Sequence, residues 1–303
     1  MKLISIGSAN IDKVFEVTHF PKSGEAMATE SLHTYVGGKG VNQAIAVGRA
    51  GSKIYYGGKI GGDGDIILNT LKEENNVDIS KLIVDPDAYT GVATVMVQQE
   101  TAENCSLLYA GTNYEISDED IDWMLDGFGK GDGLILQNEI SGTSHLLEVA
   151  HEKGITTFLT PCPLRPILRE MPEMQYVDWF FLNQVEGEYL TKMNSGTPEE
   201  LCKALVAKFP DSKIMLTLGT DGSICYDGKE YIRQKSYKVK EVDSTGAGDT
   251  FCGFCISRLM SGDSIQEAMD TASRASAICV ARAGAAPSIP TLEEVRNWKF
   301  ESQ

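Results

Sequence analysis

The chain has 303 residues, of which 42% are hydrophobic and 23% charged, a composition typical of one large α/β domain with at most a small appendage. Its formal net charge of −16 argues against nucleic acids and anionic membranes as partners, because both select basic surfaces. No apolar run approaches the length that spans a bilayer, so we expect a cytoplasmic protein.

The seven cysteines are scattered and odd in number, which favours reduced thiols over a disulfide framework. Cys252 and Cys255 have the C-x-x-C spacing of some metal and redox sites. The sequence offers no second pair and no nearby histidine to complete such a site. We therefore interpret both as packing residues of a helix.

Residues 2–7, K-L-I-S-I-G, predict a first buried strand that ends in a polar segment containing Asn10 and Asp12. Ligands of open α/β sheets gather at the carboxyl ends of the strands. Two residues apart on an extended chain, these side chains point to the same side. Their donors and acceptors suit a polyol, although a simple polar turn would also explain them.

Residues 13–36 alternate between polar and apolar types, which predicts strands outside the main sheet. Segments 91–99 and 105–109 alternate in the same way on either side of a polar turn. Together these segments predict a small four- or five-stranded sheet inserted into the α/β body.

The segment G-G-K-G-V-N-Q-A at 37–44 opens a helix that is expected to run to about Gly51. Glycines on both sides of Lys39 allow a small ligand to approach the backbone closely. Asn42 lies one helical turn after Gly38 and can face the same space. The spacing differs from that of a P-loop.

Strands and helices then alternate regularly, which predicts a parallel sheet with helices on both faces. The predicted strands are 53–60, 133–137, 155–160, 179–183, 213–218 and 223–226, and the predicted helices are 63–75, 143–153, 185–193 and 198–208.

Several of these strands end in polar residues that could line a site: Glu139, the pair Asn183 and Glu186, and the segment Thr217 to Gly222. Each has a purely structural explanation. Glu139 could cap the following helix, the Asn–Glu pair could be a capping box, and the last segment could be a loop.

The segment 237–254 predicts a strand, a turn and a helix. Gly246 and Gly248 permit a tight turn, and the first amides of the helix would form an anion site. The Asp249 carboxylate would repel an anion bound there, so its position calls for a chemical role. Removing a proton from a hydroxyl that attacks a phosphoryl group would be such a role. An aspartate that only caps the helix is the structural alternative.

The string D-S-T-G-A-G-D-T-F at 243–251 resembles the C-terminal signature D-T-x-G-A-G-D-x-F of the ribokinase (PfkB-type) carbohydrate kinases, with Ser244 as a variation. The segment G-G-K-G-V-N at 37–42 resembles the N-terminal signature of the same family. The resemblance covers essentially the whole chain. It implies one three-layer αβα kinase domain over residues 1–303, with a mainly parallel central sheet and a β-sheet lid from segments of approximately 13–36 and 89–112.

The resemblance implies transfer of the γ-phosphoryl group of ATP, with Mg²⁺, to the primary hydroxyl of a pentose, most readily ribose. It assigns Asp249 as the base, with Gly246, Ala247 and Gly248 as the anion hole. The sugar contacts that it implies are Asn10, Asp12, Gly38, Lys39, Asn42, Glu139 and Asp249. The nucleotide contacts that it implies are Asn183, Glu186, Thr217, Gly219, Gly222, Gly248 and Ser273.

The resemblance also implies a monovalent cation, K⁺, beside the anion hole. Its implied ligands are Asp243, Thr245, Cys279, Gly284 and Ser288, several of them through backbone carbonyls. Residues 264–283, dense in Ala and Ser, predict the helix that precedes this loop. A homodimer formed through the lid is a further expectation.

Two alternatives remain open at this point. One is a kinase of fructose, a nucleoside or a sugar phosphate, of which the last would need extra basic groups near the substrate; only Lys13 and Lys22 lie near the lid segments. The other is a sugar-binding protein that lacks catalysis, against which Asp249 argues, because binding alone does not require that carboxylate.

Overall fold

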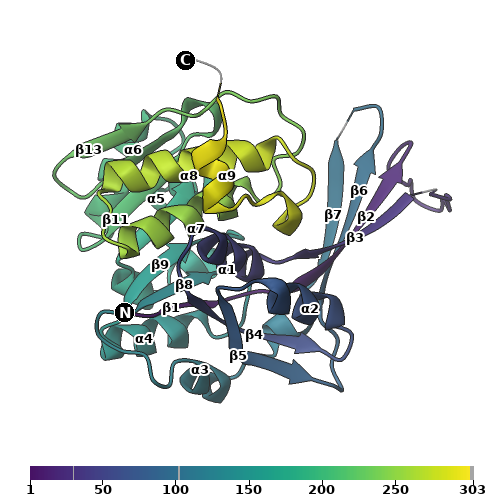
Figure 1. Cartoon of the computed structure of the whole chain (residues 1–303), viewed down its shortest axis with the longest axis horizontal. Helices are drawn as coiled ribbons and strands as arrows, with labels where there is room; N and C mark the ends of the chain where they lie inside the picture. The colour runs from purple at the N-terminus through teal and green to yellow at the C-terminus, as the bar shows by residue number, and fades with distance from the viewer. Residues whose placement is uncertain (30, 102, 301–303) are drawn as a thin grey trace.

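The computed structural model describes residues 1–29, 31–101 and 103–300, which form one nine-stranded sheet, one four-stranded sheet and the helices around them (Figure 1). In the large sheet, the strands from β11 to β5 run parallel, and β12 and β13 continue one edge in antiparallel fashion. In sheet order the strands are β13 (Tyr231–Gln234), β12 (Ser223–Tyr226), β11 (Lys213–Thr217), β10 (Trp179–Asn183), β9 (Thr156–Thr160), β8 (Gly133–Gln137), β1 (Leu3–Ile6), β4 (Ile54–Gly61) and β5 (Val77–Asp85).

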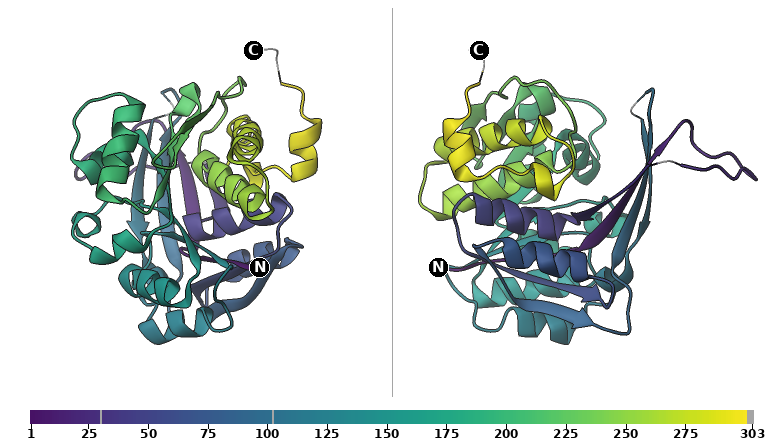
Figure 2. Two further views of the ribbon diagram at one scale, coloured as in Figure 1. Left: turned by 90° about the vertical axis from the view of Figure 1, so that its left-hand side faces the viewer. Right: turned by 45° about the vertical axis from the view of Figure 1, so that its right-hand side comes forward.

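Helices cover both faces of this sheet, which confirms the predicted three layers (Figure 2). Strand β1 shows how the sequence specifies them, because Leu3 packs into one hydrophobic core while Ile4 and Ile6 pack into the other. One layer contains α1 (Lys39–Arg49), α2 (Asp65–Glu73), α7 (Ala247–Met260), α8 (Ile265–Val280) and α9 (Leu292–Asn297). The other contains α3 (Asp118–Met124), α4 (Thr143–Lys153), α5 (Gln184–Thr191) and α6 (Pro198–Lys208).

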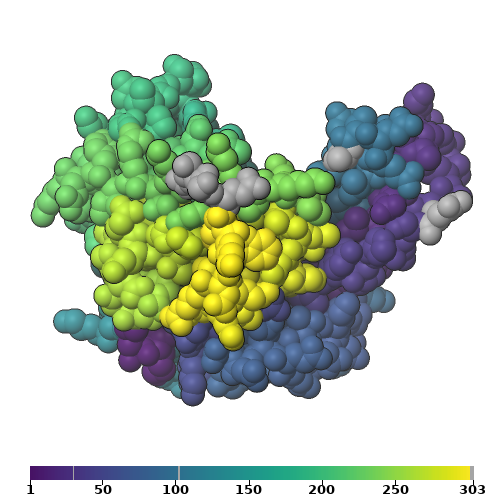
Figure 3. All heavy atoms as spheres, turned by 45° about the horizontal axis from the view of Figure 1, so that its top comes forward, coloured from purple at the N-terminus to yellow at the C-terminus, as the bar shows by residue number. Residues whose placement is uncertain are grey.

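The small sheet stands out from the body and has four strands, within the predicted range (Figure 1). Its order is β3 (Ser31–Gly37), β2 (Asn10–Val17), β6 (Gly91–Gln98) and β7 (Asn104–Tyr109). Strands β2 and β6 pair in parallel, and the two outer pairings are antiparallel. The molecular surface is hollowed between this sheet and the body (Figure 3).

Two strand predictions differ from the structure. Strand β5 was not predicted, because its sequence V-D-I-S-K-L-I-V-D mixes polar and apolar residues as an edge strand does. Residues 237–242 were predicted as a strand but have no strand conformation, and the pairing with β12 is made by β13 at Tyr231–Gln234 instead. The backbone N–H groups of Val242 and Asp243 both donate to the carbonyl of Val280 at the end of α8. This segment is therefore held by a helix end instead of a neighbouring strand.

None of the seven cysteines, all of which lie among the described residues, forms a disulfide. Cys252 and Cys255 are buried on α7, in agreement with their interpretation as packing residues. Within the described part of the chain, no helix combines the length and apolar character that crossing a membrane requires. The cellular location stays a prediction.

Candidate active site

The exit of β1 meets the start of α1 at unusually short range, and glycines make this contact possible. A Cβ atom on Gly40 would lie 2.4 Å from the carbonyl carbon of Gly7, and one on Gly38 would lie 2.6 Å from the carbonyl oxygen of Ser8. Gly38 also has φ of 91°, a conformation that residues with a side chain rarely adopt. The first turn of α1 therefore lies directly over the polar end of β1.

Lys39 and Glu139 form an ion pair at this junction. The Lys39 ammonium lies 3.2 Å from Glu139 Oε1, and the Lys39 backbone N–H donates to Oε2 at 3.2 Å. The hydroxyl of Ser8 also donates to Oε2. Burial alone would lower the pKa of Lys39, but the carboxylates of Glu139 and Asp249 outweigh it and raise that pKa, so the ammonium stays charged.

Asp12 points from β2 toward the same junction with a largely buried carboxylate. Its Oδ1 is a buried atom that finds no hydrogen-bond partner among the described residues. Burial, and the nearby charge of Glu139, raise the pKa of Asp12 to about 7 against the opposing effect of Lys39. A buried acceptor without a partner is costly, which indicates that a ligand group supplies the missing donor.

Asn10 is held in place by Asn113, which lies on the short helix Gly111–Tyr114 after β7. Asn113 Nδ2 donates to Asn10 Oδ1 at 2.8 Å, while Asn113 Oδ1 accepts from the backbone of Ala9 at 2.9 Å. Gly91 leaves room for this pair, since a Cβ there would lie within 2.3 Å of both side chains.

Asp249 lies in the first turn of α7, after Gly246, whose φ of 78° makes the turn between Asp243 and the helix. Its carboxylate accepts from Asn42 Nδ2 at 3.0 Å and from Gln43 Nε2 at 2.9 Å, one donor to each oxygen. Burial raises the pKa of Asp249, while Lys39 and the two amide donors act in the opposite direction. The two predicted signatures, about 200 residues apart in sequence, thus meet through direct hydrogen bonds.

The start of α7 offers backbone N–H groups beside Asp249. The N–H of Ala247 donates to the Ser244 carbonyl at 3.2 Å. Among the described residues, those of Gly248 and Asp249 have no backbone acceptor. The predicted anion hole is therefore open at Gly248, whereas the amide of Ala247 is already engaged.

Asn183 and Glu186 form the capping box of α5, the structural role that the sequence also allowed. Each side chain accepts the backbone N–H of the other residue at 2.9 Å. Glu186 is nevertheless buried near the charged cluster, and burial raises its pKa. The thiol of Cys162 lies within its reach, and burial raises the pKa of that thiol to about 12.

The remaining predicted nucleotide contacts lie on other elements. Thr217 ends β11, and Gly219–Asp221 forms a short 3-10 helix closed by a hydrogen bond from the Leu218 N–H to the Gly222 carbonyl. Ser273 is buried on α8, which packs along α7. Among the described residues, no hydrogen bond connects any of these three places to Asp249, so a bound nucleotide would have to bridge them.

The predicted cation ligands come together in one loop system. The Asp243 carboxylate accepts the backbone N–H groups of Thr245 and Gly284, both at 2.9 Å, and these hydrogen bonds hold its pKa below the usual range although burial opposes them. The fully buried Ser288 hydroxyl donates to the Ala285 carbonyl and lies 3.0 Å from the Cys279 thiol. Carboxylate, hydroxyl and carbonyl oxygens fit a hard monovalent cation. The Cys279 thiol points into the loop, and sulfur would be a poor ligand for such an ion, so the predicted contact of this residue is through its backbone carbonyl oxygen.

The sequence did not single out four residues that organise this region. Ser8 holds Glu139, Asn113 holds Asn10, and Gln43 and Gln137 are linked to Asp249. Gln43 lies inside the quoted G-G-K-G-V-N-Q-A segment, and Asn113 follows the predicted strand exit. Gln137 had no comparable signal, because it is the last residue of a predicted strand.

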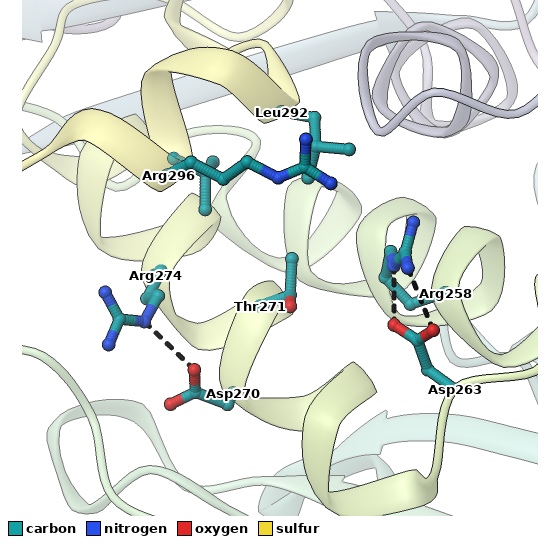
Figure 4. Close-up of a pocket in the computed structure, with 8 residues that line it drawn as sticks. Arg258, Asp263, Asp270, Thr271, Arg274, Leu292 and Arg296 are labelled. Atoms are coloured by element: carbon teal, nitrogen blue, oxygen red, sulfur yellow. Dashed lines mark hydrogen bonds and ion pairs between the residues drawn. The ribbon is translucent and has the colours of Figure 1, made fainter.

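A separate cavity of about 310 Å³ lies between α7, α8 and α9, away from these residues (Figure 4). Two of the arginines in its wall are paired, Arg258 with Asp263 and Arg274 with Asp270, and Arg296 also lines the cavity. Pairing leaves only a small net positive charge in the cavity. The converging polar groups of a reaction site are found at the junction of β1, α1 and α7 instead.

Comparisons with known proteins identify the family of the chain. The sequence model of the family described as pfkB family carbohydrate kinase matches residues 1–292. A ribokinase of Staphylococcus aureus is 33% identical, with 98% of this chain and 99% of that protein covered, and a deoxyribokinase of Salmonella typhi is 30% identical, with 98% of each covered. A structure of Arabidopsis thaliana ribokinase complexed with ribose and ATP superimposes with a TM-score of 0.87, at 28% identity and 97% coverage of both chains.

Proposed function

The chain belongs to the pfkB family of carbohydrate kinases, and we propose that it converts D-ribose to ribose 5-phosphate with ATP. Enzymes of this family are phosphotransferases with an alcohol group as acceptor. The names of its relatives support a pentose, and the similar ribokinase of Arabidopsis thaliana binds ribose and ATP. One observation in this chain carries the proposal. The side chains of Asp12 and Asn42 each present a buried acceptor oxygen without a partner among the described residues, Asn42 beside the carboxylate of Asp249 and Asp12 near Lys39 and Glu139.

These two acceptors suit sugar hydroxyls, which are the donors that a polyol supplies. The NH₂ group of Asn42 donates one hydrogen bond to Asp249 at 3.0 Å, and its Oδ1 is the acceptor that remains for a ligand hydroxyl. Lys39 and Glu139 add a charged donor and acceptor at the same junction. Asn10, fixed by Asn113, would complete the sugar contacts.

In the proposed reaction, Asp249 accepts the proton of the primary hydroxyl as the sugar oxygen forms its bond to the γ-phosphorus. The bond between that phosphorus and its bridging oxygen breaks, and ADP leaves with the electron pair. The open N–H groups at the start of α7 would stabilise the charge on the transferred group. Lys39 favours the ionised form of Asp249, which a base requires.

The nucleotide would lie between Thr217–Gly222, Ser273 on α8 and the α7 turn. Mg²⁺ neutralises the phosphate groups that it binds in phosphoryl transfer. Glu186, buried among the charged groups, would orient phosphate oxygens or metal-bound water from the capping box of α5. The Asp243 loop would hold K⁺ through oxygen atoms and so fix the turn that precedes α7.

The deoxyribokinase relative makes 2-deoxyribose the second candidate. The two sugars differ by one hydroxyl, and a site built to pair with a hydroxyl discriminates strongly against an analogue that lacks it. Since both orphan acceptors need a donor, we expect ribose to be preferred by at least about tenfold in kcat/KM.

The test is a coupled assay of ADP release with ribose, 2-deoxyribose, fructose, a nucleoside and a sugar phosphate, run on wild type and on Asp249→Asn. We expect ribose to be turned over fastest. Asp249→Asn should retain sugar and ATP binding and lose about 10²–10⁴-fold in turnover. Near-normal turnover by this variant would exclude Asp249 as the base, and turnover of none of the sugars would exclude the proposed function.

We also propose that two copies associate through the small sheet. One face of this sheet carries Leu107 of β7 at 71% exposure and Leu32 of β3 at 55%, on its two outer strands. Exposed apolar residues on one face commonly mark an interface. Sedimentation of wild type and Leu107→Lys checks this: a monomeric wild type would contradict the proposal, and a dimer that Leu107→Lys dissociates would support it.

A further inference from the structure

Two buried glutamines connect the interior of the large sheet to Asp249. Gln137, the last residue of β8, donates from Nε2 to Oε1 of Gln43 at 2.6 Å, and Gln43, on α1, donates from Nε2 to Asp249 Oδ1 at 2.9 Å. Both glutamine side chains are completely shielded from solvent. Three elements, β8, α1 and α7, are thus linked by a single chain of side-chain hydrogen bonds.

The direction of this chain follows from the chemistry of its ends. An ionised carboxylate only accepts hydrogen bonds, so Gln43 must turn its NH₂ group toward Asp249. Its carbonyl oxygen then faces Gln137, which must donate. Gln43 Nε2 also contacts the Thr160 hydroxyl, but at the longer distance of 3.4 Å. If Gln137 could not donate, the Gln43 carbonyl oxygen would lose its donor, and the amide could rotate this oxygen toward the carboxylate.

The cost of placing Gln137 here indicates that the donor matters. Gln137 Oε1 is a buried acceptor without a partner among the described residues, and it packs against Gly7, where a Cβ atom would lie 2.0 Å away. A methionine or leucine would fill the same space without an orphan oxygen. Packing alone therefore does not account for a glutamine at the end of β8.

We propose that Gln43 and Gln137 are positioning residues for the reaction: Gln43 orients the Asp249 carboxylate toward the acceptor hydroxyl, and Gln137 locks the amide of Gln43 in the donating orientation. The proposal rests on the proposed function. Asn42 holds the second carboxylate oxygen at 3.0 Å, so the plane of the carboxylate is fixed at both oxygens. Each oxygen keeps a further lone pair, which leaves the base able to accept the hydroxyl proton.

The surroundings of Asp249 make neutral donors effective. Among the described residues that act on Asp249, Lys39 at the start of α1 is the cation, and the carboxylates of Glu139 and Glu186 oppose its charge from positions after β8 and β10. The thiols of Cys252 and Cys279 also lie near, and burial raises the pKa of each, so they remain neutral. Losing an amide donor in this environment would favour the protonated carboxyl group.

The test compares Gln43→Met, Gln137→Met, Gln137→Leu and the Gln43→Met/Gln137→Met double variant with wild type. Ser257→Ala is the matched control, because Ser257 is a fully buried polar residue of α7 whose hydroxyl pairs with Ser52 and does not contact Asp249. The readouts are kcat, KM for the sugar, the pH dependence of kcat/KM, and sugar affinity by calorimetry, which also shows that each variant is folded.

We expect Gln43→Met and both Gln137 variants to lower kcat by about 10–100-fold while KM changes less than about threefold, because the base is misoriented but the sugar contacts remain. The acid limb of the kcat/KM profile should move to higher pH, since fewer donors favour the protonated carboxyl group. The double variant should equal Gln43→Met alone, because Gln137 acts only through Gln43. Ser257→Ala should retain the wild-type profile.

A wild-type kcat and an unshifted acid limb in the Gln137 variants would overturn the proposal. So would a loss confined to KM, or a double variant whose loss is the product of the single losses. If one Gln137 variant fails to fold, the other and Gln43→Met carry the same comparison. In each of these outcomes the proposed kinase function would still stand if wild type is active and Asp249→Asn is inactive. An inactive wild type would refute both the kinase function and the positioning role of the two glutamines.

Discussion

Replacing Asp12 by asparagine should stabilise the sugar-free protein while weakening its binding of sugar. Burial raises the pKa of Asp12 from its ordinary value of 3.8 to about 7. Between these values the folded protein holds a proton that the unfolded chain releases. A raised carboxyl pKa is therefore a penalty on folding that is absent below about pH 4, grows as the pH rises, and is complete above about pH 7. Asparagine has the same shape and does not titrate, so it escapes the penalty.

The size of the effect follows from the interval over which the penalty grows. From pH 5.5 to about pH 7 the penalty increases over about 1.5 pH units, which at 1.36 kcal/mol per unit is about 2 kcal/mol. The difference in unfolding free energy between Asp12→Asn and wild type should accordingly be about 2 kcal/mol larger at pH 8.5 than at pH 5.5. Titration of all other groups cancels in this difference, because it is common to both proteins.

Urea unfolding at the two pH values measures the effect, with fluorescence and circular dichroism compared to check that one transition is observed. Calorimetry at pH 8.5 should show that Asp12→Asn binds ribose about 10–100-fold more weakly, because an amide replaces a charged acceptor. A stability difference that is the same at both pH values would refute the reasoning, since it would mean that Asp12 titrates at its ordinary value.

Three further predictions use the same site. Gly37→Ala should lower sugar affinity at least about tenfold, because its Cβ would lie 2.0 Å from Asp12 Oδ2; calorimetry checks this, and unchanged affinity would show that the carboxylate can move aside. Glu139→Ala should weaken sugar binding more than ATP binding, since Glu139 holds Lys39 at the sugar junction; a larger loss of ATP affinity would reverse the two subsites. Replacing K⁺ by Na⁺ at constant ionic strength should lower turnover, and Asp243→Ala should abolish the response; a flat wild-type titration would remove the cation site alone.

The sequence predicted most of the layered fold because buried parallel strands and amphipathic helices have strong local patterns. The sequence-based prediction failed where two segments compete to pair with the same neighbouring strand. Residues 237–242 alternate as a strand would, yet 231–234 pair with β12. Both segments are short and polar, and local pattern does not contain the information that separates them.

The candidate site divides in a similar way. Asp249 and Asn42 were predicted from glycine-rich motifs whose backbone chemistry is local, and the structure brings the two motifs into contact. Gln137 contacts Gln43 across 94 positions of sequence, and nothing in its own neighbourhood distinguishes it from a strand end. The role of Asn183 and Glu186 was open between a cap and a ligand contact; the structure shows the cap, and the ligand contact stays a prediction.

The two sheets are joined at the residues proposed to hold the sugar. Strand β1 ends at Ile6 and β2 begins at Asn10, and Asn10 pairs with Gly37, which ends β3 shortly before α1 begins at Lys39. A rotation of the small sheet against the body would therefore turn Asn10 and Asp12 relative to Lys39. A sugar that contacts both sides of this joint binds most tightly to the conformation in which the two sheets make one particular angle. The angle between the sheets and the sugar affinity are therefore linked thermodynamically. A substitution that biases the angle, even at the far end of the small sheet, would then change sugar affinity without touching the sugar.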